Sequence, residues 1–231
     1  MSYIKENLNN VCEQMKKTAA ECGRNVSDVR LVAVTKTYGA DLINEAIDGG
    51  VTDIGENRVQ EIMEKYDAVK PVRWHLIGHL QKNKVKYIID KVELIHSVDS
   101  FELAKEIDKH AKKIDKVQRI LLEVNVSGEE SKFGIRPDEC EALCRRISEL
   151  ENVKIEGLMT IAPFVDDEKI LENVFSGLKN LSNDISTKSL KNVDMTELSM
   201  GMTNDFPLAI ECGSTIIRVG TGIFGKRNYT K

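Results

Sequence analysis

The chain has 231 residues, of which 41% are hydrophobic and 30% charged, and its formal net charge is −4. This composition is too apolar for a disordered chain and gives no overall attraction for nucleic acid or an anionic membrane. No stretch approaches the roughly 20 apolar residues of a membrane span, and the first residues lack the apolar segment of a secretion signal. We therefore expect a single cytoplasmic domain over residues 1–231.

Short β-branched, apolar runs alternate with helical patterns along the chain. The predicted strands are 29–36, 51–57, 72–78, 94–99, 119–125, 155–161, 197–203 and 215–221. The predicted helices are 3–22, 40–49, 58–68, 81–90, 101–114, 137–150, 166–185 and 205–211. Such alternation is typical of βα units around a parallel sheet.

Eight βα units predict an α/β fold, namely a TIM-type (β/α)8 barrel with an additional N-terminal helix. The alternative is an open doubly wound sheet, which usually carries a glycine-rich turn after its first strand. The residues after the first predicted strand are Thr37, Tyr38 and Gly39, which contain no GxGxxG pattern. The barrel is therefore favoured, and its functional residues should lie at the carboxyl ends of the strands.

Lys36 ends the first predicted strand, and alternation places it on the same face as Val32 and Val34. A lysine pointing inward at the barrel mouth is partly desolvated, which favours a neutral amine able to form a Schiff base. The alternative is a lysine that extends to solvent from the end of the strand. Position alone does not identify a cofactor.

The last predicted strand leads into a glycine-rich segment. Gly220 and Gly222 allow backbone N–H groups to approach a phosphate, Thr221 adds a hydroxyl, and Arg218 places a cation on the same strand face. Barrels commonly bind phosphate after their seventh and eighth strands. The alternative is an ordinary glycine-rich turn beside a surface arginine.

The penultimate strand adds Ser199 and Gly201 next to that segment. Its alternative interpretation is a methionine-lined strand followed by a helix cap at Thr203 or Asn204.

Two histidines and five cysteines raise the question of a metal. His75 and His79 flank the third predicted strand, but no further histidine or carboxylate stands at ligand spacing. We interpret them as a packed strand residue and a loop residue. The cysteines are scattered without a CxxC pair, which favours reduced thiols, so no metal is expected.

Six segments together resemble the YggS/PROSC family of pyridoxal phosphate homeostasis proteins, whose fold is the barrel of the N-terminal domain of alanine racemase. The matching segments are 31–36, 55–61, 74–84, 157–163, 198–205 and 218–225. Small departures are Arg58 and Thr203, where an aromatic residue and a serine are expected.

The resemblance implies that pyridoxal 5'-phosphate (PLP) is held as a Schiff base on Lys36. It also implies that Ser199 and the backbone near Gly220 and Thr221 take the phosphate, and that Arg218 faces the pyridine nitrogen. The residues implied to line the ring are Asn57 and Met159. An arginine there can only donate, so the nitrogen stays unprotonated and the ring is a weak electron sink.

Two functions remain open. One is a binder that buffers PLP and hands it to PLP-dependent apo-enzymes, and the other is a PLP-dependent amino-acid racemase. A racemase needs a proton-transferring group on each face of the cofactor. In alanine racemase, as the resemblance implies, the group opposite the lysine is a tyrosine, and a C-terminal domain completes the site. Here only Tyr38 is expected near the mouth, and ten residues follow Thr221. We expect the buffering function, without catalytic residues.

Four lysines near the mouth have no assigned role. Lys82, Lys84 and Lys86 are expected to form a solvated helical face, with phosphate steering as the alternative. Lys132 is expected in a loop, where the resemblance suggests a part in cofactor release.

Overall fold

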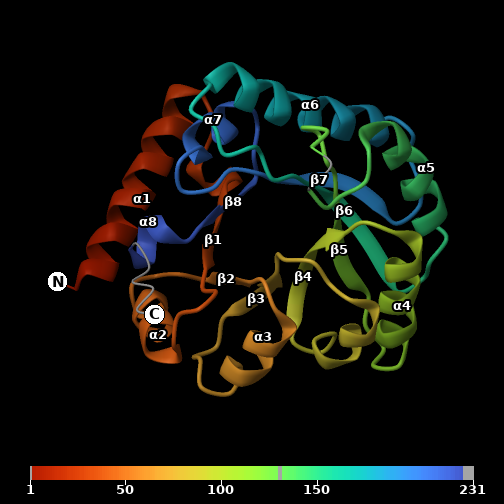
Figure 1. Cartoon of the computed structure of the whole chain (residues 1–231), viewed down its shortest axis with the longest axis horizontal. Helices are drawn as coiled ribbons and strands as arrows, with labels where there is room; N and C mark the ends of the chain where they lie inside the picture. The colour runs from red at the N-terminus through yellow and green to blue at the C-terminus, as the bar shows by residue number, and fades with distance from the viewer. Residues whose placement is uncertain (1, 130–131, 226–231) are drawn as a thin grey trace.

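Eight parallel strands close into a barrel in chain order, from β1 to β8 (Figure 1). The structure is a computed structural model that describes residues 2–129 and 132–225. The strands are β1 (Arg30–Val34), β2 (Asp53–Glu56), β3 (Arg73–Leu76), β4 (Val92–Val98), β5 (Gln118–Glu123), β6 (Val153–Met159), β7 (Val193–Ser199) and β8 (Ile216–Val219). Because β8 pairs with β1, the predicted barrel is confirmed and the open sheet is excluded.

Helices surround the barrel as an outer ring (Figure 1). They are α1 (Tyr3–Glu21), α2 (Ala40–Asp48), α3 (Val59–Lys65), α4 (Phe101–Lys112), α5 (Pro137–Ile147), α6 (Glu168–Ser186), α7 (Phe206–Glu211) and α8 (Thr221–Phe224), with 3-10 turns η1 (Val26–Asp28) and η2 (Lys82–Tyr87). The predicted N-terminal helix is α1, which begins where the Ser2 hydroxyl accepts from the Lys5 N–H. Its buried face includes Ile4, Leu8 and Val11.

Two segments differ from the sequence prediction. Residues 81–90 were expected to form an α-helix but form the 3-10 turn η2, in which only Val85 is buried. Val85 and Ile88, three residues apart, are both buried, which suits the three-residue period of a 3-10 turn. The last strand ends at Val219, so Thr221 begins the short helix α8 instead of ending β8.

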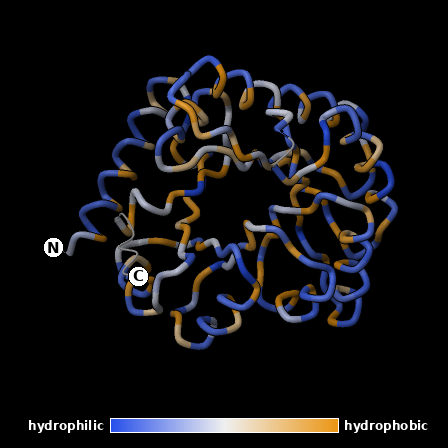
Figure 2. The backbone as a smooth tube through the Cα atoms, viewed as in Figure 1, coloured by the Kyte–Doolittle hydropathy of each residue, from blue (hydrophilic) through white to orange (hydrophobic). Residues whose placement is uncertain are grey.

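The barrel interior is filled by side chains. The inner layer consists of Val32, Leu94, Leu121, Met159 and Ile216. These side chains come from five strands and alternate with outward residues that pack under the helices, as in TIM-type barrels. In Figure 2 the strands and the inner faces of the helices are largely hydrophobic, and the outer faces are hydrophilic.

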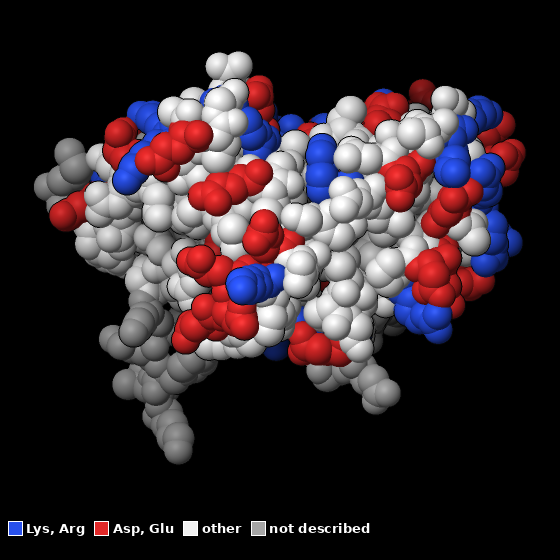
Figure 3. All heavy atoms as spheres, turned by 90° about the horizontal axis from the view of Figure 1, so that it is seen from above, with Lys and Arg blue, Asp and Glu red and all other residues white. Residues whose placement is uncertain are grey.

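The outer surface carries charges of both signs. On the face shown in Figure 3, lysine and arginine side chains are interspersed with aspartate and glutamate. Across residues 2–129 and 132–225, no helix combines the length and apolar character needed to cross a membrane.

Candidate functional site

A cavity of about 230 Å³ opens at the carboxyl end of the barrel. Its walls come from segments that end or follow β1, β6, β7 and β8, namely residues 34–36, 162–164, 202–205 and 218–221. The cavity is small and suits a compact ligand. A larger cleft of about 850 Å³ lies beside it, between the segments after β1, β2 and β3. We place the candidate site in the smaller cavity because it joins a lysine, a buried arginine and two threonine hydroxyls.

Lys36 lines this cavity and is half-buried. The turn around it is fixed on both sides. Before it, the buried Thr35 hydroxyl donates to Glu56 Oε1 across 2.7 Å. After it, Thr37 has a φ of 71°, which is strained for a β-branched residue, and its N–H donates to Glu61 Oε2 across 2.6 Å. These bonds hold the turn to the neighbouring βα unit and so keep Lys36 at the mouth.

Arg218 projects from β8 into the same cavity and is only 4% exposed. Its Nη1 donates to Ser199 Oγ across 2.6 Å, and its Nη2 donates to the Thr160 carbonyl across 2.8 Å. Burial lowers the pKa of Arg218 to about 10, against the opposing attraction of the Asp205 and Glu123 carboxylates. The guanidinium therefore stays protonated at neutral pH and supplies a fixed cation.

Two threonine hydroxyls also border the cavity. Thr221 and Thr203 both line it, and Thr203 Oγ1 accepts the Gly222 N–H across 3.2 Å. A Cβ on Gly222 would lie 2.9 Å from Val219 Cγ1 and 3.1 Å from Thr203 Cγ2, so this position leaves no room for a side chain. Gly220 also lines the cavity. Such a cluster of hydroxyls and bare backbone suits a phosphate group.

The cavity thus brings together Lys36, Arg218, Gly220 and Thr221, but not the other three predicted residues. Ser199 is fully buried, and its hydroxyl is engaged by Arg218 and by His96 Nδ1 at 2.9 Å. Met159 is fully buried in the inner layer of the barrel. Asn57 lines the larger cleft.

The lysines with open roles lie outside the cavity. Lys84 lines the larger cleft. Lys132 Nζ contacts Glu129 Oε1 at 2.6 Å and the Ile161 carbonyl at 3.3 Å. Lys82, Lys84 and Lys86 lie on the 3-10 turn η2 instead of the predicted α-helix, but Lys82 and Lys86 are exposed, as expected of a solvated face.

Sequence reasoning missed several buried polar residues of the interior. Glu123 is 6% exposed, and burial, reinforced by the Asp99 carboxylate, raises its pKa to about 7. His96 is fully buried on β4. The alternation of the strands could have revealed both residues. It places Glu123 on the same face as Leu121 and His96 on the same face as Leu94, and both leucines belong to the inner layer.

The histidine interpretation of β3 is confirmed. His75 is fully buried and packs edge-on against His96, and His79 stacks on Phe133 with ring centroids 4.5 Å apart. Within the described part of the chain, no group of three or more His, Cys, Asp or Glu side chains could hold a metal ion.

The barrel matches a known class of proteins. Residues 6–228 match the family model described as the alanine racemase N-terminal domain. Over 226 residues the chain is 44% identical to the pyridoxal phosphate homeostasis protein of Aquifex aeolicus, covering 97% of this chain and 98% of that protein. The chain therefore belongs to the pyridoxal phosphate homeostasis protein family within the alanine racemase N-terminal class.

Two solved structures agree with the fold. An unknown protein from Bifidobacterium adolescentis has a TM-score of 0.91 and 38% identity, covering 96% of this chain and 94% of that chain. PipY of Synechococcus elongatus with PLP bound has a TM-score of 0.80 and 33% identity, covering 92% of this chain and all of that one. The family and fold expected from the sequence are confirmed.

Proposed function

We propose that this chain binds PLP in the 230 Å³ cavity and holds it as a Schiff base on Lys36. It acts in PLP homeostasis as a single-domain cytoplasmic protein that buffers the cofactor and hands it to PLP-dependent apo-enzymes. The observation that carries this proposal is the set of groups around one small cavity: an amine, a buried guanidinium and a hydroxyl-rich Gly-Thr segment. The name of the Aquifex relative and the PLP bound to PipY support it.

The groups around the cavity match the two ends of the cofactor. PLP supplies an aldehyde that condenses with a lysine amine. Lys36, which lines the cavity, supplies that amine. The Thr221 and Thr203 hydroxyls and the backbone at Gly220 bind the phosphate. Arg218 would donate toward the pyridine nitrogen and, because a guanidinium can only donate, would favour the unprotonated nitrogen as its acceptor.

The remaining three predicted residues act mainly by support. Ser199 orients Arg218 through the 2.6 Å hydrogen bond between Oγ and Nη1. Met159 fills the barrel interior. Asn57 borders the larger cleft. Direct contacts of these three with the cofactor stay predictions, and Thr203 is the hydroxyl that the geometry adds to Thr221.

The environment of Tyr38 favours buffering over racemization. Its hydroxyl donates to the Gly225 carbonyl across 3.0 Å, and its ring stacks on Phe224 with centroids 4.6 Å apart. Of the tyrosines in the described ranges, none lines the cavity. A second proton-transferring group, which racemization needs, is therefore not supplied by a described tyrosine.

Absorption spectroscopy tests the proposal. Purified protein incubated with PLP should turn yellow, and Lys36→Ala should abolish the Schiff-base band. Lys132→Ala is the matched control and should keep the band. Borohydride reduction followed by peptide mass spectrometry should place the label on Lys36. A colourless wild-type protein, or a label on another lysine, would refute the assignment.

A second measurement separates the two functions. The loaded protein is incubated with a panel of L-amino acids in deuterated water, and incorporation of deuterium at the α-carbon is followed. We expect no exchange at enzymatic turnover. Rapid exchange would favour the racemase.

A further inference from the structure

A chain of four hydrogen bonds crosses the barrel interior. At the mouth, Arg218 Nη1 lies 2.6 Å from Ser199 Oγ, which lies 2.9 Å from His96 Nδ1. His96 Nε2 lies 2.9 Å from His75 Nδ1, and His75 Nε2 lies 3.0 Å from Asp53 Oδ1. None of these five residues is more than 4% exposed. The hydrogen-bond chain therefore joins the candidate site to the amino end of β2 without passing through solvent.

The two end groups fix the direction of every bond. A guanidinium can only donate and a carboxylate can only accept. Ser199 accepts from Arg218 and must give its single proton to His96 Nδ1. His96 then carries its proton on Nε2 and donates to His75, which in turn donates from Nε2 to Asp53. With neutral rings, no other arrangement satisfies all four bonds.

The surroundings keep both rings neutral. Burial lowers the pKa of His75 and of His96, and for His96 the neighbouring His75 and Arg218 act in the same direction. The pKa of Asp53 is held below its usual range by hydrogen bonds from Arg73 and His75, although burial opposes this. The carboxylate therefore stays charged and acts only as an acceptor.

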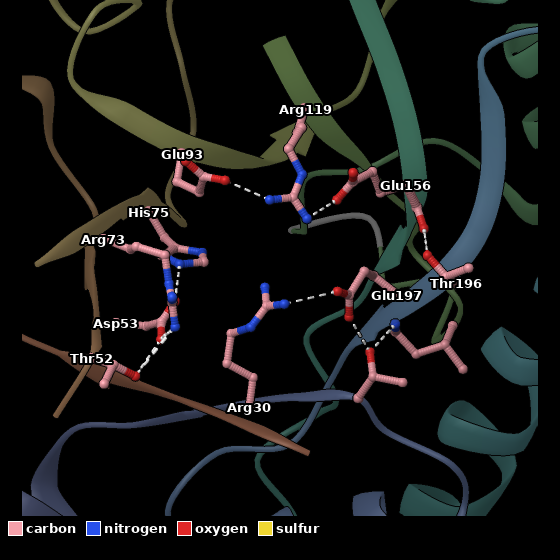
Figure 4. A network of polar contacts seen from close by, with 12 residues as sticks. Arg30, Thr52, Asp53, Arg73, His75, Glu93, Arg119, Glu156, Thr196 and Glu197 are labelled. Atoms are coloured by element: carbon pink, nitrogen blue, oxygen red, sulfur yellow. Dashed lines mark hydrogen bonds and ion pairs between the residues drawn. The ribbon is translucent and has the colours of Figure 1, made fainter. Parts of the chain in front are cut away.

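The Asp53 end of the hydrogen-bond chain is fixed by further hydrogen bonds. Arg73 donates to the Asp53 carboxylate from Nε to Oδ1 across 2.7 Å and from Nη2 to Oδ2 across 2.6 Å. The Thr52 hydroxyl also donates to Oδ2, across 2.7 Å. Figure 4 shows this group beside further ion pairs, including Arg30 with Glu197 at 3.2 Å. Asp53 is thus part of a charged layer that closes the amino end of the barrel.

We propose that His96, His75 and Asp53 are positioning residues for Arg218. A serine hydroxyl rotates freely and could turn its proton toward the guanidinium. His96 Nδ1 accepts the hydrogen bond from that hydroxyl, which leaves a lone pair of Ser199 facing Arg218. The guanidinium is then held by Ser199 and by the Thr160 carbonyl while Arg218 lines the cavity. That the pyridine ring occupies this cavity rests on the proposed function, whereas the hydrogen-bond chain itself does not.

The first test needs no cofactor. Long-range 1H–15N correlation spectra of the ligand-free, 15N-labelled protein at pH 7 report the tautomer of each histidine. Both His75 and His96 should be neutral with the proton on Nε2. A proton on Nδ1 of either ring, or a charged ring, would overturn the proposal. This measurement does not depend on PLP binding. It therefore distinguishes failure of the hydrogen-bond chain from failure of the proposed function.

The second test breaks the chain at Ser199. In Ser199→Ala, exchange of the Arg218 Nη protons with water should accelerate at least about tenfold, and PLP affinity should fall about tenfold, as for loss of a hydrogen bond to a charged group. The matched control is Ser182→Ala, which removes a buried hydroxyl on α6 that donates to the Met195 carbonyl. Unchanged Arg218 exchange in Ser199→Ala would overturn the proposal. If that variant does not fold, the wild-type tautomers decide.

Discussion

Thr221 Oγ1 donates a hydrogen bond to Thr203 Oγ1 across 3.2 Å, and this bond joins the start of α8 to the loop after β7. Both residues line the cavity, so the two hydroxyls form one edge of the candidate phosphate site. The pair also explains why Thr203, a departure from the serine expected at this position, is compatible with the site. A threonine keeps the hydroxyl, and its methyl group packs near Gly222.

Replacement of Thr203 by valine tests this edge. Thr203→Val keeps the shape and removes the hydroxyl, so the affinity for PLP should fall about tenfold. The affinity for pyridoxal, which lacks the phosphate, should be unchanged. Spectral titration with each compound gives both values. Thr187→Val, at an exposed position after α6, is the control. An equal loss for PLP and pyridoxal would argue against a phosphate contact.

Gly222→Ala tests the close packing beside that edge. The added Cβ would lie 2.9 Å from Val219 Cγ1 and would displace Thr203. We expect a loss of about 1–3 kcal/mol in unfolding free energy, as for other overpacked positions, together with weaker PLP binding. Urea denaturation measures the first effect. Gly39→Ala, where a Cβ meets nothing within 4 Å, should cost less than about 1 kcal/mol, as expected at the N-cap of α2, and should leave PLP binding unchanged.

Glu123→Gln tests the buried carboxyl near Arg218. Its pKa is raised to about 7 in the folded protein, so the folded state keeps a proton that the unfolded chain releases above its ordinary pKa of 4.5. Wild-type stability should therefore fall as pH rises through this window. Glu123→Gln has no carboxyl at this position, so its stability should not fall in this way. It should match the wild type near pH 5 and exceed it by on the order of 2–3 kcal/mol at pH 8.

Urea denaturation across this pH range measures the difference between Glu123→Gln and the wild type. The buried histidines have lowered pKa values and destabilise both proteins at low pH, so their effect cancels in the difference. Glu211→Gln, on the exposed side of α7, is the control. A difference independent of pH would contradict the raised pKa.

Asp53→Ala removes the acceptor at the end of the hydrogen-bond chain. It leaves the buried His75 N–H without its partner and frees Arg73, so the unfolding free energy should fall by about 3–5 kcal/mol. Asp48→Ala breaks the exposed pair with Lys70 and should have no measurable effect. Equal stability of the two variants would show that the buried network contributes little.

The fold was predictable because its signal repeats. Eight β-branched runs separated by helical patterns indicate one topology, and the structure differs mainly at the ends of elements. The turn η2 was missed because the apolar residues Val85, Ile88 and Ile89 suggest an α-helix, and so short a stretch does not separate an α-helix from a 3-10 turn. Helix α8 was missed because Gly220 and Thr221 read equally well as the end of a strand.

The site was predictable in part. Alternation along β1 and β8 correctly brought Lys36 and Arg218 to one cavity. It could not tell how deep each inward residue lies, so it did not separate Ser199, below the cavity floor, from Thr203 at its edge. The pairing of His75 with His96 depends on the register between β3 and β4, which shifts at a bulge. Sequence periodicity does not report such a shift.

The filled interior has a consequence for exchange of the ligand. The inner layer of five apolar side chains lies below the cavity, and the charged layer of Figure 4 closes the amino end. A molecule in the cavity can therefore leave only by the opening through which it entered. Entry and exit of a ligand must therefore use the same opening, so the two processes compete for it.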